Sequence, residues 1–507
     1  MVRCARNVKT GQSDSKLTPK RGSVKGRNLM RILFAYTDIN IKGGELNCNH
    51  GIATLSAILK QAGHQINLVY LYGKYDPQIL TQQIASFRPD LLAFSSMSAQ
   101  FRYVKRLLQD LDQKHRRGLL TICGGVHPTS VPECLEETDG LDAICIGEGE
   151  HALLEFVEAL EQGRDHSTVK GFWVKDNGKI HKNPSRDFIT DLDSIPFGDL
   201  EIFDYQKIIN SNYGRARFFV TRGCPYNCYY CCNHVFRGSQ SGKYVRFRSI
   251  ENVIREMETV LSKYSVKVIF VEDDTFTMKE DFVYEFCDQY KKRIKLPLMM
   301  HTRAETVTLD MFKKLKDAGC YRVAIGVESG NSFIRNKVLN RKMSNEQIIK
   351  AFKIAKEVGM VTKSFNIVGF PFETETHFKN TIKLNQEINP DLLVINTFDP
   401  YPGTKLYEVC KEKRFLTNLD ESDRFIPRTD TVLNMPQFSR ERILKCYRNF
   451  AFNVYKKHSL PKAILYRIYY SRYGEDLIKL LSPIKDYLFS FVEGKKSKGA
   501  ATACRAV

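Results

Sequence analysis

The chain has 507 residues, of which 43% are hydrophobic, and a formal net charge of +20. This length allows two or three domains with cores of their own, and the hydrophobic content excludes a largely disordered protein. No apolar run approaches the ~18–20 residues that span a bilayer, and the polar first 30 residues contain no apolar stretch typical of a signal peptide, so we expect a cytoplasmic protein.

The positive charge lies mostly at the two ends of the chain. Residues 1–30 contain eight Lys or Arg and one acid, and residues 440–507 contain fifteen and five. The 409 residues between these segments carry a net charge of only +3. The pattern does not indicate a basic groove in the body of the protein, which argues against nucleic acid as the main partner.

The first half of the chain alternates between strand and helix patterns. Residues 1–29 are rich in Lys, Arg, Ser and Gly, and we expect them to be disordered. Over residues 30–165, strand patterns occur in RILFAY, QINLVYLY, DLLAFSSM, LLTICGG and AICIGE, each followed by a helical pattern. Because parallel strands need crossover helices, this unit is predicted to be a doubly wound, Rossmann-like parallel sheet. Residues 166–214 break the rhythm and predict a linker with a hairpin around residues 176–178.

A second alternation runs over residues 215–405. Its strand patterns are ARFFVT, VKVIFVED, PLMMHTR, YRVAIGVES, KSFNIVGF and DLLVINTF. Six successive β/α units predict an open or partial (β/α)6 barrel, a fold in which chemistry lies at the carboxyl ends of the strands. Residues 406–507 are predicted to be a mainly helical, basic region.

Four cysteines follow the first strand of this second unit in TRGCPYNCYYCCN: Cys224, Cys228, Cys231 and Cys232. Three thiolates spaced C-x3-C-x2-C on a tight loop can bind three irons of a 4Fe–4S cluster and leave the fourth iron open. Zinc is the competing metal, but a closed zinc site usually needs a second cysteine pair, and only Cys232 or His234 could complete a cramped site here. The other cysteines are scattered through apolar segments, which indicates reduced thiols rather than disulfides.

The cysteine spacing, with the aromatic Tyr230 before the third cysteine, resembles the signature loop of radical S-adenosylmethionine (SAM) enzymes. Later strands of the unit resemble that family too, although VEDD offers acids where the family usually has glycines. The resemblance implies that Cys224, Cys228 and Cys231 bind a 4Fe–4S cluster and that Cys232 is a bystander. It also implies SAM contacts by Tyr230, by Glu272 and Asp273 near the methionyl amine, by Glu328 at the ribose, and by Gly369 at the adenine.

Small and polar residues follow three neighbouring strands of the first unit, in FSSMS, GGVHPT and IGEGE. Ligands bind at carboxyl ends of strands in such sheets, and glycines allow close approach of a bulky cofactor. Before a radical SAM unit, this arrangement resembles the cobalamin-binding domain of cobalamin-dependent radical enzymes. The implied cobalamin contacts are Ser95, Ser96, Gly124, Gly125, His127, Thr129, Gly147 and Gly149. An Asp-x-His-x-x-Gly motif is absent, so no histidine ligand to cobalt is assigned, and His50 and His127 are expected to be structural or cobalamin-tail contacts.

Together the two resemblances imply a cobalamin-dependent radical SAM methyltransferase. Such an enzyme methylates an unactivated carbon through a 5′-deoxyadenosyl radical and methylcobalamin, with a one-electron reductant such as flavodoxin or ferredoxin. The substrate would be a small molecule or lipid-like compound. Cyclisation or oxidative rearrangement without net methyl transfer stays open, and a tRNA methylthiotransferase or a non-catalytic cofactor carrier ranks below it.

The C-terminal segment 440–507 combines its basic charge with eleven Tyr or Phe. Interleaved basic and aromatic residues on helices suit peripheral contact with an anionic membrane surface. The alternative, which the usual behaviour of amphipathic helices favours, is a helical cap on the barrel with a solvated basic face.

Overall fold

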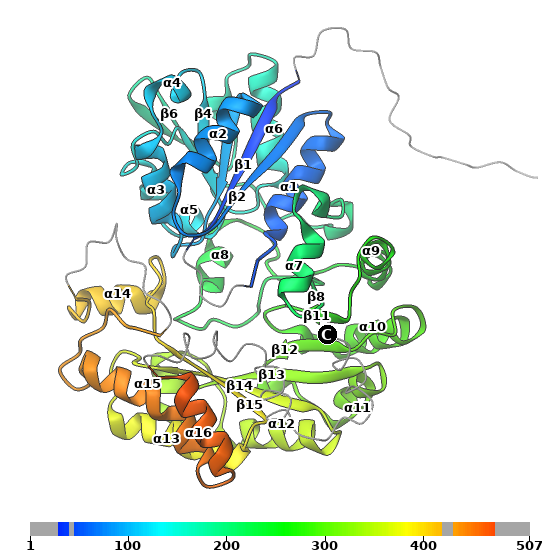
Figure 1. The fold of residues 1–507 in the computed structure, drawn as a ribbon, viewed down its shortest axis with the longest axis vertical. Helices are drawn as coiled ribbons and strands as arrows, with labels where there is room; N and C mark the ends of the chain where they lie inside the picture. The colour runs from blue at the N-terminus through cyan, green and yellow to red at the C-terminus, as the bar shows by residue number, and fades with distance from the viewer. Residues whose placement is uncertain (1–28, 40–44, 418–428, 472–507) are drawn as a thin grey trace, which may run out of the picture.

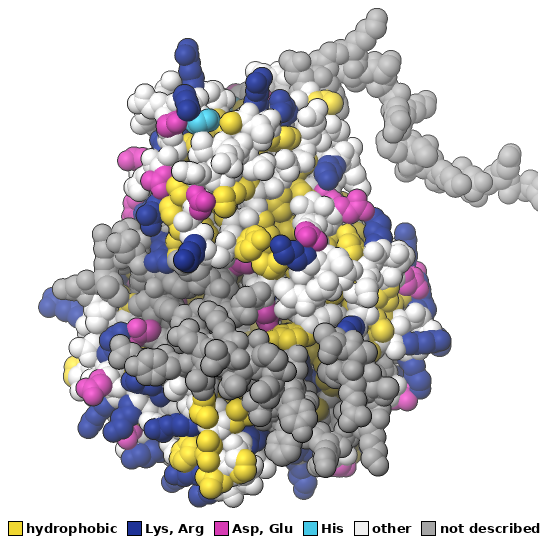
Figure 2. Space-filling model, in the orientation of Figure 1, with side chains coloured by type: hydrophobic (Ala, Val, Ile, Leu, Met, Phe, Trp, Pro, Cys, Tyr) yellow, Lys and Arg dark blue, Asp and Glu magenta, His cyan; other side chains and the backbone are white. Residues whose placement is uncertain are grey.

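A computed structural model describes residues 29–39, 45–417 and 429–471 of the chain. Two large sheets, one in each half of the chain, lie one above the other in Figure 1. On the face shown in Figure 2, Lys and Arg side chains are spread over both halves rather than gathered into one track. None of the helices in the described ranges is long and apolar enough to cross a membrane.

The first sheet has seven strands in the order β2-β1-β3-β4-β5-β6-β7. Its strands are β1 (Arg31–Ile39), β2 (Gln65–Gly73), β3 (Leu91–Ser95), β4 (Leu120–Gly124), β5 (Ala143–Cys145), β6 (Phe172–Asp176) and β7 (Lys179–Lys182). Strands β1 to β5 are parallel, which confirms the predicted doubly wound unit. Nearly all of β1 is buried, as expected for a strand with helices on both faces of the sheet.

The predicted hairpin is present, but it extends the first sheet. Strand β6 pairs antiparallel with both β5 and β7. The turn between β6 and β7 has φ of 47° at Asn177 and 76° at Gly178. Two successive positive φ angles suit the two-residue hairpin turns that match the twist of a sheet, and Asn-Gly is the sequence that best accepts them.

Helices connect the strands of the first sheet. They are α1 (His50–Gln61), α2 (Pro77–Phe87), α3 (Phe101–Asp110), α4 (Gln113–Arg116), α5 (Val126–Ser130) and α6 (Glu150–Glu161), and α7 (Tyr205–Ser211) leads into the second unit. Asn49 caps α1 by accepting a hydrogen bond from the Ile52 amide.

The second sheet has six strands, all parallel, in the order β15-β14-β13-β12-β11-β8. The strands are β8 (Arg215–Phe218), β11 (Val268–Val271), β12 (Leu298–Thr302), β13 (Cys320–Glu328), β14 (Val361–Val368) and β15 (Leu392–Thr397). Each overlaps one of the six predicted strand patterns, although β8, β13 and β14 begin one or two residues before the predicted start. Strands β8 and β15 are the two edges, so the sheet is a partial barrel.

Helices cover the outer face of this barrel (Figure 1). They are α9 (Ile250–Lys263), α10 (Glu280–Arg293), α11 (Leu309–Asp317), α12 (Asn345–Glu357), α13 (Glu375–Ile388) and α14 (Lys405–Glu412). Side chains of Ser249, Thr308, Ser344 and Thr374 accept hydrogen bonds at the starts of α9, α11, α12 and α13. Each such cap stabilises its helix by about 1 kcal/mol.

The C-terminal helices α15 (Arg440–Tyr455) and α16 (Leu460–Tyr469) pack on the barrel. Their aromatic residues Tyr447, Phe450, Tyr455 and Tyr466 are buried in one apolar cluster with residues of β14 and β15. For residues 440–471 the helical-cap alternative is therefore the one observed. The rest of the predicted basic helical region, residues 472–507, lies outside the described residues, as do the predicted disordered residues 1–28.

Candidate active site

The carboxyl edges of the two sheets face each other. His50, which follows β1, lies edge-on against Phe219 after β8, with ring centroids 5.1 Å apart. The amide of Glu148 after β5 donates a 2.8 Å hydrogen bond to Gln240 at the end of α8 (Asn233–Ser239). Gly403, after β15, lies so close to the Ser130 carbonyl that a Cβ there would be 2.5 Å from the oxygen. A group bound at one of these edges would therefore lie close to a group bound at the other.

Buried ion pairs join these edges. Arg246 donates two hydrogen bonds to Glu148, at 2.8 and 2.9 Å, and only 4% of the Arg246 side chain is exposed. Arg222 bridges Glu148 and Glu150. Burial alone raises the pKa of Glu148, but the hydrogen bond from Arg246 and the charge of Arg222 lower it overall. This network could not be predicted from the sequence, because its members are far apart along the chain.

The cysteine loop leaves the short strand β9 (Thr221–Arg222) and ends at α8. Cys224 and Cys228 are buried, and Cys231 is partly buried. Gly223 has φ of 85°, and a Cβ there would lie 2.4 Å from the Tyr244 carbonyl oxygen, so only glycine fits at the entry to the loop.

Each of the three predicted cluster cysteines has a polar partner, which for Cys224 and Cys228 lies on another segment. Cys224 Sγ lies 3.9 Å from the Thr275 hydroxyl, Arg303 donates to Cys228 Sγ at 3.3 Å, and Asn233 donates to Cys231 Sγ at 3.3 Å. Asn233 and Arg303 are fixed in turn: Asp274 and Tyr244 bind the amide of Asn233, and Glu305 binds the guanidinium of Arg303. Such outer partners orient sulfur ligands and tune a cluster, and the sequence analysis named none of them.

The donor set fits a cluster better than a single metal ion. Among the residues that the structure describes, no three His, Cys, Asp or Glu side chains converge on a site for one ion. Three thiolates that bind three different irons do not need to converge on one point. The hydrogen bond from Cys232 lowers the pKa of the Cys231 thiol to about 7, which favours the thiolate at Cys231 and leaves Cys232 as its donor.

The acids after β11 point in different directions, as expected from strand alternation. Glu272 forms an ion pair with Arg217 at 3.4 Å on the inner face of the barrel. Asp273 is buried, and its carboxylate accepts from the Val220 amide and the Thr221 hydroxyl. These bonds hold β9 in place and argue against the predicted SAM contact of Asp273. Asp274, which the sequence analysis did not select, is exposed and binds Asn233 beside Cys231.

Glu328 and Tyr230 meet at Arg341. Arg341 donates to the Tyr230 hydroxyl at 3.1 Å and to the Gly326 carbonyl at 2.8 Å, and it lies 3.9 Å from the Glu328 carboxylate. Burial raises the pKa of Glu328, against the opposing charge of Arg341. Glu328 also has φ of 59°, a left-handed conformation that directs the chain sharply away from the end of β13.

Gly369 has φ of 92° and lies against Ile443 of α15. Its amide donates to the Glu373 carboxylate at 2.7 Å, and Phe370 donates to the same oxygen at 3.3 Å. Burial raises the pKa of Glu373 to about 8. Glu373 therefore shapes the turn that carries the predicted adenine contact, a role that its place in GFPFE could have suggested.

The predicted cobalamin residues of β3 and β4 form a shallow, uncharged edge. The Ser95 hydroxyl accepts from Asn49, and the Thr129 hydroxyl donates to the Gly125 carbonyl. A Cβ on Gly124 would meet nothing closer than 3.6 Å, whereas one on Gly125 would lie 3.1 Å from the Ser96 backbone. Small, uncharged residues at this edge allow close approach of a cofactor, so the edge fits the predicted cofactor.

The remaining predicted cobalamin residues have protein partners. His127 stacks on Phe101 with centroids 4.1 Å apart, and its Nδ1 lies 3.2 Å from the Ser98 hydroxyl. Gly147 donates to the Thr129 hydroxyl, and a Cβ on Gly147 would lie 2.4 Å from the Gln240 side chain. Glycine is thus required at position 147 by the second domain, whereas Gly149, at the start of α6, has its nearest neighbour 3.6 Å from a Cβ.

The inner face of the barrel surrounds His301 of β12. The imidazole lies edge-on to Phe270 of β11 and to Phe365 of β14, at centroid distances of 4.9 and 5.3 Å. Burial, together with the charges of Lys363, Arg322 and Arg217, lowers the pKa of His301 to about 4. At neutral pH it is therefore an uncharged hydrogen-bonding group between two aromatic rings.

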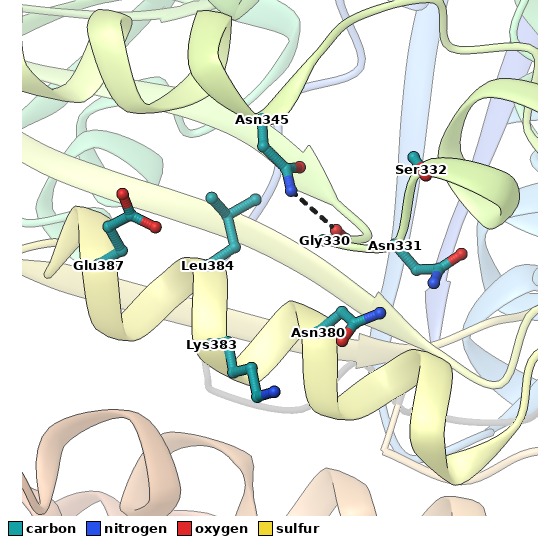
Figure 3. Close-up of a pocket in the computed structure, with 8 residues that line it drawn as sticks. All are labelled: Gly330, Asn331, Ser332, Asn345, Asn380, Lys383, Leu384 and Glu387. Atoms are coloured by element: carbon teal, nitrogen blue, oxygen red, sulfur yellow. Dashed lines mark hydrogen bonds between the residues drawn. The ribbon is translucent and has the colours of Figure 1, made fainter.

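Two further cavities lie outside this edge-to-edge region. One, of about 240 Å³, is lined mainly by polar and charged side chains and lies between the turn after β13 and the helices α12 and α13 (Figure 3). Asn345 closes one side of it by donating to the Gly330 carbonyl. The other, of about 260 Å³, is mainly apolar and borders Tyr229 in the cysteine loop.

Comparison with known proteins identifies both units. Residues 37–157 match the B12 binding domain, and residues 218–384 match the Radical SAM superfamily. An uncharacterised methyltransferase of Pyrococcus horikoshii is 28% identical over 76% of this chain and 82% of its own. The anaerobic magnesium-protoporphyrin IX monomethyl ester cyclase of Rubrivivax gelatinosus is 26% identical over 84% of this chain and 78% of its own.

A solved structure shares the fold of both units. The cobalamin-dependent S-adenosylmethionine radical enzyme OxsB, with aqua-cobalamin and S-adenosylmethionine bound, superimposes with a TM-score of 0.69 at 16% identity, over 91% of this chain and 76% of its own. The two family matches make the chain a radical SAM enzyme with a B12 binding domain, and the cofactors of these two units are a 4Fe–4S cluster, SAM and cobalamin. Enzymes of this class use an external reductant, and the carrier hypothesis is wrong.

The methylthiotransferase alternative finds no support in the first domain. It would need three more cluster cysteines there, but Cys123, Cys134 and Cys145 are buried.

Proposed function

We propose that the protein methylates an unactivated carbon of a small-molecule substrate held between the two facing sheet edges. The observation that carries this proposal is the direct contact of residues after β1, β4 and β5 with residues after β8, β15 and α8. When bound, the cluster supplies the electron that cleaves SAM, and cobalamin supplies the methyl group. The Pyrococcus methyltransferase, which aligns with most of this chain, supports the same reaction class.

On this proposal, Cys224, Cys228 and Cys231 hold the cluster, and their bonds to Thr275, Arg303 and Asn233 keep the three sulfurs in place. Glu328 accepts hydrogen bonds from the SAM ribose, with Arg341 balancing its charge, while Tyr230 packs nearby. The backbone of the turn at Gly369 would contact the adenine. Asp274 replaces Asp273 as the acid nearest the methionyl amine.

Ser95, Ser96, Gly124 and Thr129 would hold cobalamin at the uncharged edge that they form. Gly125 contributes by allowing Ser96 to pack close to the β4 loop. His127 remains fixed by Phe101 and Ser98, which suits a contact to the cofactor periphery rather than a ligand to cobalt.

The substrate lies on the inner face of the barrel, beside His301. Phe270 and Phe365 give this space apolar walls, and His301 offers a neutral hydrogen-bonding group. Glu272 and Arg217 form its polar border toward the first domain. The side chains orient a substrate that has both apolar and polar parts.

An anaerobic assay tests the methylation proposal. The reconstituted protein, with cobalamin, reductant and SAM, is incubated with a small-molecule extract of cells that lack it. We expect both 5′-deoxyadenosine and S-adenosylhomocysteine to accumulate, together with a product heavier than its precursor by one methylene. His301→Ala should abolish that product while SAM cleavage without substrate continues.

Cyclisation or oxidative rearrangement is the second candidate, because the Rubrivivax cyclase aligns with 84% of this chain. It predicts 5′-deoxyadenosine without S-adenosylhomocysteine when the true substrate is present. That single difference in products separates the two reactions.

Membrane contact and a lipid-like substrate form a further part of the proposal. Leu460, Ile464 and Ile468 are exposed and lie at four-residue spacing on one face of α16. An apolar stripe beside basic side chains suits an anionic lipid surface. Sedimentation with anionic liposomes should be lost when these three residues are replaced by Ser, and no sedimentation of the wild-type protein would refute the contact.

A further inference from the structure

We propose that the apolar cavity beside the cysteine loop is the docking surface for an acidic one-electron donor protein. We call it the donor groove and define it by Tyr229, Phe333, Lys337, Val338, Phe372, Lys405, Leu406 and Val409. The inference rests on the proposed function in one respect, namely that a cluster bound by the cysteine loop must receive electrons from outside.

The floor of the donor groove is the cysteine loop itself. The Tyr229 amide donates to the Leu339 carbonyl at 3.0 Å, and the Leu406 amide donates to the Tyr229 carbonyl at 3.1 Å. These bonds clamp the loop between the π-helical turn Ile334–Val338 and the start of α14. Tyr229 directly follows Cys228, so a protein seated in the groove would lie against the loop that carries the cluster.

The walls of the groove are unusually apolar for an exposed surface. Phe333 is 48% exposed and Phe372 is 38% exposed, and they flank the same cavity. Large exposed aromatic side chains that share one concave site indicate an interaction surface, since isolated monomers rarely leave them uncovered. Aromatic residues are also enriched where partner proteins bind tightly.

The charge at the groove selects an acidic partner. Lys337 and Lys405 are exposed at its rim, and none of the residues that line it is acidic. The Lys405 ammonium lies 4.1 Å from the centre of the Tyr229 ring, which orients this charge over the cysteine loop. Complementary charge speeds encounter between proteins and fixes their register.

The position favours an electron donor over other occupants. Electron transfer weakens steeply with distance, and the facing sheet edges are reserved for cofactors and substrate on the proposed function. A donor must therefore approach the cluster from another side, which the groove provides. Its small extent also suits redox partners, whose transient interfaces are typically below about 1,200 Å².

The test measures cluster reduction directly, independently of any product. Reduced flavodoxin is mixed anaerobically with the cluster-loaded protein, and the loss of cluster absorbance is followed by stopped flow. For Lys337→Glu/Lys405→Glu we expect a second-order rate constant about tenfold lower at low ionic strength, with the difference shrinking as salt screens the charges. Lys313→Glu/Lys350→Glu, exposed on α11 and α12, is the matched control and should keep the wild-type rate.

A small neutral reductant, photoreduced deazaflavin, separates docking from damage to the cluster. It should reduce all variants at the same rate, and Phe333→Ala should slow reduction by flavodoxin alone. A wild-type rate for the Lys337→Glu/Lys405→Glu protein with flavodoxin would overturn the proposal, as would equal slowing by deazaflavin. If that variant keeps its flavodoxin rate but loses product formation, the groove admits substrate instead. If the Lys337→Glu/Lys405→Glu protein is reduced more slowly by flavodoxin but the wild-type protein forms no methylated product, only the proposed reaction is refuted.

Discussion

The carboxyl edges of the two sheets differ sharply in charge. The edge of the barrel carries buried ionisable groups, such as Glu328 beside Arg341 and Arg303 beside Glu305. The edge of the first sheet, at β3 and β4, presents hydroxyls, glycines and backbone groups. The same parallel architecture therefore offers two kinds of binding surface.

On the proposed function, the difference in charge matches the groups that each edge would bind. SAM carries a positive sulfonium, an amine and a carboxylate, and a cluster carries charge on its sulfur ligands, so charged groups at the barrel edge have partners. Cobalamin is bulky and would cover the edge that it binds. Because the small residues of this edge are uncharged, covering them would not require a charge to be removed from water. The ion pairs of Glu148, Glu150, Arg222 and Arg246 lie where the two edges join.

The largest expected effect comes from breaking that junction. Arg246 is buried and Glu148 is partly buried, and Arg246→Ala leaves the Glu148 carboxylate without its bidentate partner, so we expect a loss of about 3–5 kcal/mol in the free energy of unfolding. Thermal or urea unfolding followed by circular dichroism measures it. Lys263→Ala, which removes an exposed ion pair with Glu201, is the control and should change stability by less than about 1 kcal/mol. Equal effects of the two substitutions would contradict a junction held by buried charge.

The buried acid of the barrel edge predicts a pH dependence of folding stability in the neutral range. Because the pKa of Glu373 is raised to about 8 in the folded state, the unfolded chain loses this proton near pH 4.3 while the folded chain keeps it. Folding stability should therefore fall as pH rises from about 4.3 to about 8, by on the order of 4 kcal/mol. Glu373→Gln should remove this part of the decline, measured as the shift in unfolding midpoint between pH 5 and pH 8.5. Glu387→Gln, an exposed change on α13, should not; a wild-type decline in Glu373→Gln would refute the assignment.

A substitution at the end of β4 tests whether the uncharged edge of the first sheet binds cobalamin. Gly124→Leu places a branched side chain where the cofactor is proposed to lie, and we expect cobalamin affinity to fall about a hundredfold. Gly124→Ala is the control, because its Cβ meets only the Cys145 side chain at 3.6 Å. Binding is followed by the cobalamin absorbance spectrum. Undiminished affinity in the Leu variant would place cobalamin elsewhere.

The smallest expected effect is on SAM affinity. Glu328→Gln removes the charge from one hydrogen-bond acceptor, a change of about 1.5–3 kcal/mol, or roughly ten- to a hundredfold in the dissociation constant. Cobalamin affinity should not change, which gives an internal control in one titration series. Weakened binding of both cofactors would mean that the substitution disturbs the fold rather than a contact.

The fold was largely predictable because its signals are local. Short apolar runs in the sequence predict the strands. The Asn177-Gly178 pair predicts the turn of the hairpin. That the hairpin adds to the first sheet was not predictable, since the pairing of β6 with β5 depends on contacts distant in the sequence. The cysteine loop could also be predicted, because its four cysteines lie within nine consecutive residues.

The supporting residues of the site were missed because only the fold brings them together. Arg303 lies 75 residues from Cys228, and Glu148 lies 98 from Arg246. Glu272, Asp273 and Asp274 point in different directions after β11. The sequence VEDD alone does not show which of these three side chains faces the site. Gly147 looked like a ligand-binding glycine, but Gln240 accounts for it.

The most direct measurement is Mössbauer and EPR spectroscopy of the protein reconstituted anaerobically with iron and sulfide. The account predicts one 4Fe–4S cluster per chain whose reduced EPR signal changes on addition of SAM, loss of that cluster in Cys224→Ala/Cys228→Ala/Cys231→Ala, and its retention in Cys232→Ala. A cluster that survives the triple substitution would contradict the central claim.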